Sequence, residues 1–382
     1  MKKKIIFIVN HAAFFCSHRL AIAQQLIKQN YSFHLIIGQA GSNEMEAEAI
    51  KVLKINKISY SRTLFSPQFS INIFKELFSI IQIIFILFKI RPHIVHLVSP
   101  KAILFGGIAS KLAFIKKRVF AISGLGYFYT GKKNLKHRIL KSIYFSLLKI
   151  IFSNDSTKII VQNSSDHYEL KNILNLHNVD KFEIIHGSGV DHKVFKFAKF
   201  KIRKKVILMT ARILFDKGVV EFFKAAKILK KKHKDWKFIL IGSIDYKSPS
   251  TLDRAVFEKL LKEKNVEWKG YKKDIRNDIK NCSIFCLPSY REGMSKSLIE
   301  AAMSGIPIVT TNVPGCRDTV IKNITGVLVK PKNHVSLALG IEKLIISEDL
   351  RILFSKKARL FAKKKFSLNS VVNKTMNIYK KI

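Results

Sequence analysis

The chain has 382 residues, of which 48% are apolar, so it can bury a sizeable core and is long enough for two domains. Lysine and arginine number 69 against 26 aspartates and glutamates, a net charge of +43 that predicts an anionic partner: nucleic acid, a phosphate-bearing substrate or an anionic bilayer. The cysteines fit no zinc-site spacing and form no C-x-x-C, which indicates reduced thiols in a cytosolic protein; they are Cys16, Cys282, Cys286 and Cys316.

Neither apolar segment that stands out indicates a membrane span. The N-terminal run IIFIV is short and is followed by Asn10 and His11, which predicts a first strand instead of a signal peptide. The longest apolar stretch, Leu77 to Phe88, has 12 residues. Because about 20 residues are needed to cross a bilayer, we expect a buried or interfacial helix there.

Strand-like and helix-like segments alternate along the chain. Helical segments separate the expected strands, which lie within residues 3–10, 32–38, 54–65, 91–99, 117–124, 157–163 and 181–187. The same alternation begins again in the second half, with strands expected within 204–213, 236–243, 266–271, 283–289, 306–312 and 326–330. This alternation predicts an α/β protein with two Rossmann-like domains, each a doubly wound parallel sheet that binds ligands beyond the carboxyl ends of its strands. The glycine pairs at 124 and 187 lack the full dinucleotide fingerprint, which disfavours an oxidoreductase.

Two carboxylates follow one predicted strand of the second half. Glu292 lies in the loop after this strand, and Glu300 lies eight positions further on. A helix is expected to begin near Ser295 or Ser297, where free backbone N–H groups favour an anion. Two ordinary interpretations stay open: Glu300 completes a capping box with Ser297, and Glu292 is a solvated loop acid.

This stretch resembles the E-x7-E signature of retaining GT-B glycosyltransferases of the glycosyltransferase family 4 type. The resemblance covers most of the chain, and it looks closest to bacterial members that add a sugar to a lipid-diphosphate-linked acceptor in capsule, O-antigen or glycoprotein glycan synthesis. The segments that carry it are NHAAFFCSHRLAIAQQL, HLVSPKAILFGGIASKLA, ISGLGYFYTGK, VQNSSDHYELKNIL, IIHGSGVDHKVF, MTARILFDKGVVEFFKAA and LPSYREGMSKSLIEAAMSGIPIVTT.

The resemblance implies a donor site in the second domain for a nucleotide sugar, expected to be UDP-linked and to carry a hexose or N-acetylhexosamine. Glu300 would bind the ribose hydroxyls, and Glu292 would contact the sugar and favour positive charge at its anomeric carbon. Arg212 and Lys217 would hold the diphosphate, which suits the negative charge that a leaving diphosphate gains; surface charge is the alternative for these two cations. The remaining donor-binding candidates are Gly293, Met294, Ser295 and Ser297.

The first half departs from the family pattern at one position. Many members carry His-x-His after the fourth strand, whereas Val98 stands at the second histidine position here. We expect His96 to be packed in its strand and take Lys101 as the candidate that supplies a cation or donor instead. His11 and His18 are further candidates in this domain.

The resemblance also predicts an acceptor side, a domain layout and the absence of a metal. In the loop SGLGYFYTG, Gly124 and Gly126 would allow a tight turn and Tyr127 or Tyr129 would stack on a sugar. The expected domains are 1–185 on the acceptor side and 186–365 for the donor, with a C-terminal helix at 366–382 that crosses back to the first domain. No Asp-x-Asp has a metal-site context, and the family type usually needs none, so we expect neither metal nor other cofactor.

The positive charge has three competing explanations. Residues 130–150 hold six Lys/Arg and no acid among apolar residues, which predicts an interfacial helix on anionic lipid; a solvated basic face over an ordinary core is the alternative. Nucleic-acid binding is the rival, but the basic residues are spread through the chain and no known module appears. A non-catalytic membrane-surface protein is the third possibility, against which the four donor-site residues argue. We expect a cytoplasmic enzyme, peripheral on the inner face of the cell membrane, that does not bind nucleic acid.

Overall fold

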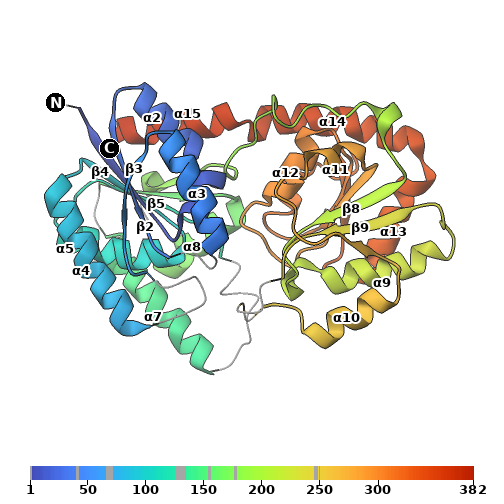
Figure 1. The fold of residues 1–382 in the computed structure, drawn as a ribbon, viewed down its shortest axis with the longest axis horizontal. Coiled ribbons are helices and arrows are strands. Elements are labelled where there is room, and N and C mark those ends of the chain that lie inside the picture. The colour runs from blue at the N-terminus through green and yellow to red at the C-terminus, as the bar shows by residue number, and fades with distance from the viewer. Residues whose placement is uncertain are drawn as a thin grey trace. The chain divides into compact units, whose positions relative to one another are not determined.

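The computed structural model describes residues 2–39, 43–65, 72–125, 135–153, 156–175, 179–244, 248 and 250–382. These residues form two compact units, each built around its own parallel sheet (Figure 1). The described residues up to Ser188 belong to the first unit, together with Val371–Ile382, and Gly189–Ser370 form the second. The chain therefore enters the second unit at about residue 189 and returns to the first at about residue 371.

The sheet of the first unit has seven strands in the order β3-β2-β1-β4-β5-β6-β7, all parallel. The strands are β1 (Lys4–Val9), β2 (Ser32–Ile37), β3 (Ser59–Arg62), β4 (Ile94–Val98), β5 (Arg118–Ala121), β6 (Thr157–Val161) and β7 (Phe182–Ile184). The five apolar residues that end β1 are all fully buried, because helices cover both faces of a doubly wound sheet.

The helices of the first unit include the last helix of the chain. They are α1 (Ala12–His18), α2 (Leu20–Lys28), α3 (Asn43–Ile55), α4 (Ile73–Ile90), the π-helical η1 (Ala102–Gly106), α5 (Gly107–Leu112), α7 (Leu135–Ile151), α8 (Ser164–Leu174), the 3₁₀ turn η2 (Val179–Lys181) and, for most of its length, α15 (Leu368–Lys381). The fully buried Tyr379 of α15 packs its ring 6.5 Å from that of Phe7 in β1 and 5.7 Å from that of His96 in β4.

The sheet of the second unit has six parallel strands in the order β10-β9-β8-β11-β12-β13. The strands are β8 (Val206–Thr210), β9 (Lys237–Ile241), β10 (Glu267–Trp268), β11 (Ile284–Leu287), β12 (Ile308–Thr311) and β13 (Gly326–Val329). The helices and 3₁₀ turns are η3 (Phe200–Ile202), η4 (Phe215–Lys217), α9 (Val219–Lys230), α10 (Arg254–Lys262), α11 (Arg276–Asn281), α12 (Lys296–Met303), η5 (Arg317–Thr319), α13 (His334–Ile346) and α14 (Glu348–Phe366). The two sheets confirm the predicted fold class.

The strand order of the second sheet places three loops at one edge. Strand β11 lies between β8 and β12, and all three run parallel. The loops that follow them therefore leave the sheet at the same edge, where open α/β sheets bind their ligands. These loops carry Lys217, Glu292 and Gly315 respectively.

None of the described helices combines the length and apolar character required to traverse a bilayer.

Candidate functional site

An ion pair joins two of the loops at the carboxyl edge of the second sheet. Lys217 Nζ lies 2.6 Å from Glu292 Oε1, although the two residues are 75 positions apart, and Ser289 Oγ donates to the same oxygen at 2.8 Å. The side chains of Lys217 and Glu292 are 18% and 15% exposed. The interpretation of Glu292 as a solvated loop acid is therefore wrong, because its carboxylate is largely buried and held by two donors.

A second carboxylate, which the sequence analysis missed, belongs to the same cluster. Burial raises the pKa of Asp216, and the charge of Glu292 raises it further against the effect of Lys217. Asp216 Oδ1 is buried and has no hydrogen-bond partner among the described residues. Burial opposes the charge on Lys217, but Glu292 and Asp216 outweigh this effect, so the pKa of Lys217 is raised. The Lys217 ammonium is thus paired with Glu292 and further stabilised by the charge of Asp216.

Arg212 lies two residues beyond the end of β8 and is exposed. Its charge acts on both neighbours, since it lowers the pKa of Asp216 and opposes protonation of Lys217. Arg212 and Lys217 therefore place two cations after one strand, the first exposed and the second largely buried.

Two glycines in the left-handed region let these loops approach one another closely. Gly218 has φ +73°, and a Cβ atom there would meet Pro288 O at 2.2 Å. Gly315 has φ +75°, and a Cβ atom there would meet Glu292 O at 2.3 Å. Glu292 N also donates to Pro314 O at 3.1 Å. The backbone on both sides of the ion pair is thus fixed by residues that tolerate no side chain.

Glu300 lies in the second turn of α12. Ser295 is the N-cap, and its Oγ accepts from Leu298 N at 3.4 Å. The capping-box interpretation with Ser297 is therefore wrong, because the helix begins two residues earlier than that pattern requires. The Glu300 carboxylate is 10% exposed and lies 3.3 Å from Lys296 Nζ. Burial raises the pKa of Glu300, and Lys296 partly offsets the increase.

The other donor-binding candidates form the turn between the two glutamates. Gly293, Met294 and Ser295 are buried, and Ser295 N donates to Gly315 O at 3.2 Å. Ser297 Oγ lies 3.2 Å from Ser295 Oγ at the start of α12. The structure brings all of these residues to one edge of the sheet; their contacts with a donor stay predictions.

The candidates in the first unit have local partners. His11 caps α1, with Nδ1 accepting from Phe14 N at 3.2 Å, and His18 stacks on the Phe14 ring at 4.6 Å. Lys101 Nζ lies 2.9 Å from Oε1 of the buried Glu76 in α4. These contacts explain the residues' conformations, and their roles toward an acceptor stay predictions.

The remaining candidate positions of the first unit lie in β4 or soon after β5. Val98 is fully buried at the end of β4, and His96 is 1% exposed, so the prediction of a packed His96 is confirmed. Gly124 has φ +128°, a conformation that favours glycine. Gly126 and Tyr127, as well as Tyr129, lie outside the described residues.

Both halves of the chain match known protein families. Residues 191–361 match the model of glycosyl transferases group 1, and residues 4–163 match that of the glycosyl transferase 4-like proteins. The N,N'-diacetylbacillosaminyl-diphospho-undecaprenol alpha-1,3-N-acetylgalactosaminyltransferase of Campylobacter jejuni is 30% identical over 342 residues, 86% of each chain. The capsular polysaccharide biosynthesis glycosyltransferase CapM of Staphylococcus aureus is 28% identical over 321 residues, 81% of this chain and 82% of CapM.

A solved structure supports the architecture. Anabaena HepE in complex with UDP and glucose superposes with a TM-score of 0.79 over the whole of both chains, at 15% identity. At this identity the similarity shows a shared fold, in which two parallel-sheet units follow one another along the chain.

Proposed function

The chain belongs to the glycosyltransferases of the family 4 type and has their GT-B fold, and from this premise we propose that it transfers a hexose or N-acetylhexosamine from a UDP-linked donor to a lipid-diphosphate-linked glycan. Two similarities support the choice of substrates. The name of the Campylobacter jejuni relative specifies a diphospho-undecaprenol acceptor, and HepE was solved with UDP and glucose. The CapM relative acts in capsular polysaccharide biosynthesis, and we propose a role in surface-glycan assembly of this kind.

The observation that carries the proposal is the Lys217–Glu292 pair at the carboxyl edge of the second sheet. A departing nucleoside diphosphate gains negative charge, which Lys217 and the exposed Arg212 would stabilise. The sugar left behind gains positive charge, which the Glu292 carboxylate would favour. Glu300 would accept hydrogen bonds from the ribose. The donor needs both signs of charge within a few ångströms, and this site supplies both.

We propose that no metal ion is required, because Arg212 and Lys217 provide the positive charge that a divalent cation otherwise brings to a diphosphate. We further propose retention of anomeric configuration. The acceptor hydroxyl would attack the same face of the sugar from which the diphosphate leaves, so Glu292 need not form a covalent intermediate.

The proposal is tested with a panel of UDP-sugars and an undecaprenyl-diphosphate-linked acceptor sugar. We expect one or two donors to support transfer, detected as a mass increase of one sugar on the lipid, with equal rates in EDTA and in Mn²⁺. Release of free sugar without transfer would contradict the acceptor class. Activity lost in EDTA and restored by Mn²⁺ would contradict the metal-independent mechanism.

An apolar surface on the first unit supports a lipid-bound acceptor. Helix α4 has one acid, Glu76, which is buried and paired with Lys101. Its outward face is apolar, with side chains 52% to 84% exposed; they are Phe74, Leu77, Phe78, Ile81, Phe85 and Phe88. Ile83 and Leu87 of the same helix are buried, so α4 is apolar on both sides and lacks the polar outer face of a usual amphipathic helix.

The neighbouring helices extend this surface. Helix α5 contacts both α4 and α7, and the three form one layer of the first unit (Figure 1). Exposed apolar side chains continue along α7 at Leu135, Ile139, Leu140, Ile143 and Ile150. Exposed cations accompany them at Lys75, Lys89, Arg91, Arg138 and Lys149. Apolar side chains among cations match an anionic bilayer, so we propose that this α4–α7 surface rests on the membrane that carries the acceptor.

Replacement of Phe78 and Phe85 by glutamine tests the α4–α7 surface. We expect co-sedimentation with vesicles containing anionic lipid to weaken at least about tenfold, because inserted aromatic side chains contribute a large apolar area. The matched control replaces Leu353 and Leu360, exposed on α14 of the second unit, and should bind like the unchanged protein. Equal binding by both double variants would contradict the assignment, and a loss of self-association in sedimentation velocity would identify a second copy as the occupant instead.

A further inference from the structure

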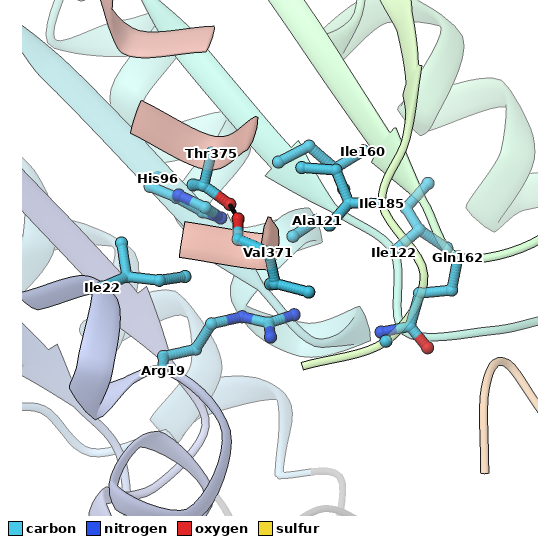
Figure 2. A pocket seen from close by; sticks show the side chains of 11 residues that line it. Arg19, Ile22, His96, Ala121, Ile122, Ile160, Gln162, Ile185, Val371 and Thr375 are labelled. Atoms are coloured by element: carbon cyan, nitrogen blue, oxygen red, sulfur yellow. Dashed lines mark hydrogen bonds between the residues drawn. The ribbon is translucent and has the colours of Figure 1, made fainter. Parts of the chain in front are cut away.

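A buried arginine lines a small pocket of the first unit (Figure 2). Arg19 lies at the junction of α1 and α2 and is 5% exposed. Its Nη1 donates to His18 O at 3.1 Å. Its Nε is buried and has no hydrogen-bond partner in the described part of the chain, where no carboxylate forms an ion pair with Arg19 either. Burial lowers the pKa of Arg19 to about 10, so the side chain is still a cation at neutral pH.

The second polar group of the pocket is His96. The hydroxyl of Tyr379 is hydrogen-bonded to His96 Nδ1, and burial raises the pKa of Tyr379 well above its usual value. This hydroxyl therefore keeps its proton, and His96 Nδ1 is its acceptor. The ring proton of the neutral imidazole is then on Nε2, which is buried and has no partner among the described residues. Burial and the charge of Arg19 hold the pKa of His96 well below its usual range, so the ring stays neutral.

The pocket lies where β4, β5 and β6 meet α15. Its wall includes Gln162, directly after β6, and Thr375 of α15. In Figure 2 the Arg19 guanidinium extends across the pocket toward the side that carries Gln162. The cavity volume is about 10 Å³, close to the minimum that holds one water-sized group. A single oxygen atom of a ligand can therefore enter, whereas a sugar ring cannot.

We propose that this pocket binds a phosphoryl oxygen and that, in the reaction proposed above, it holds a phosphate of the lipid-diphosphate-linked acceptor. Arg19 and His96 each have a buried N–H donor without a partner among the described residues, and an oxyanion is the class of ligand that such donors bind. A buried cation without a counter-charge is costly, and a bound phosphate would remove this cost. The pocket reaches residues beyond the carboxyl ends of β5, β6 and β7, the part of an α/β sheet where ligands bind. The assignment to the acceptor rests on the proposed function, whereas phosphoryl binding does not.

The test compares Arg19→Gln with Arg118→Gln. Arg118, on β5, is also buried, and two of its guanidinium nitrogens have no partner among the described residues. It does not line the pocket, so its replacement controls for the loss of a buried arginine. Pyrophosphate binding to the full chain is measured by calorimetry with the donor site saturated with UDP. We expect the unchanged protein and Arg118→Gln to bind pyrophosphate, and Arg19→Gln to bind at least tenfold more weakly. Equal binding by the two variants, or no binding by the unchanged protein, would overturn the site.

Steady-state kinetics show whether the bound phosphate belongs to the lipid-linked acceptor or is free phosphate. Arg19→Gln should raise the KM for the lipid-linked acceptor at least tenfold and leave the KM for the UDP-sugar unchanged. Lost pyrophosphate binding with an unchanged acceptor KM would show a site for free phosphate and overturn the acceptor assignment. If Arg19→Gln does not fold, Arg19→Lys replaces it, and we expect a several-fold weakening because the planar fork is lost while the charge remains. If no donor is transferred at all, the proposed function fails, and the pyrophosphate measurement still decides the site.

Discussion

The charges of Lys217 and Glu292 stabilise each other in the folded protein, apart from any contact with a substrate. The Lys217 ammonium is largely buried, and Glu292 together with Asp216 keeps it charged. Removal of a single partner from a buried pair leaves the other charge uncompensated. A variant of either residue therefore needs a stability measurement beside its kinetics, whereas Arg212 is exposed and reports on chemistry alone.

We expect Arg212→Ala and Lys217→Ala each to lower kcat by about 10² or more, because each cation contributes a few kcal/mol to the leaving diphosphate. Turnover is measured at saturating donor and acceptor, and unfolding by urea is followed in parallel. Lys205→Ala is the control, since it removes an exposed lysine that pairs with Asp235 in the same unit. Near-normal turnover in both site variants would contradict the diphosphate clamp.

Glu300→Gln separates ligand binding from helix stability. Since Ser295 is the cap of α12, the loss of the Glu300 charge should leave the helix intact, and Ser295→Ala should cost about 1 kcal/mol of stability. UDP affinity measured by calorimetry should fall by about 1–3 kcal/mol in Glu300→Gln, the range for hydrogen bonds to charged groups. Unchanged UDP affinity would assign Glu300 to its contact with Lys296 instead of to the ribose.

At the scale of elements, the loops after β11 and β12 are held together by backbone contacts. Gly315 allows the second loop to pass directly over Glu292 O, and its carbonyl accepts from Ser295 N. The position of the Glu292 carboxylate is therefore set from the neighbouring strand as well as from its own.

The Gly315→Ala variant tests this coupling. A left-handed conformation alone costs an alanine about 1–2 kcal/mol, and the contact with Glu292 O should add to that cost and displace the Glu292 loop. We expect a larger loss of unfolding free energy than in Gly270→Ala, which has φ +64° with no atom within 4 Å of the added Cβ. Activity should fall only in Gly315→Ala. Equal stability and activity in the two variants would show that the close approach is unimportant.

Local spacing predicted the elements but not the contacts between them. The runs IIFIV and VILM are continuous and apolar because both faces of their strands are covered, so β1 and β8 could be predicted from the sequence alone. Helix starts were less certain, because neighbouring polar residues compete as caps. At the start of α8, Asn163, Ser164 and Ser165 are all suitable caps, and the structure uses Asn163, whose side chain accepts from Asp166 N.

Contacts between loops that are distant in the sequence cannot be predicted from a local sequence pattern. Nothing in the spacing of Lys217 and Glu292 shows that they pair, because the order of β8 and β11 in the sheet brings them together. Asp216 was missed for the same reason. The Lys101–Glu76 pair depends on how α4 packs, and so does the exposure of the apolar face of α4. The resemblance selected the donor-site candidates, and the structure shows which residues contact them.

At the scale of the whole molecule, we expect the excess of positive charge to bind two different anionic partners. Cations in the second unit would face a diphosphate, and cations around the α4–α7 surface would face a bilayer. The protein would thus work at a surface where a charged donor and a lipid-anchored acceptor both carry phosphate. Net charge by itself does not select this account over nucleic-acid binding; the ion pair at the strand edge and the family membership do.

The central claim is sugar transfer to the lipid-linked acceptor with retention, and NMR of the product tests it most directly. The coupling between H1 and H2 of the transferred sugar distinguishes the two anomers when the donor is a gluco- or galacto-configured UDP-sugar with an α-linkage. We predict a small coupling, typical of an α-linked product. A large coupling, typical of a β-linked product, would contradict retention and with it the proposed role of Glu292.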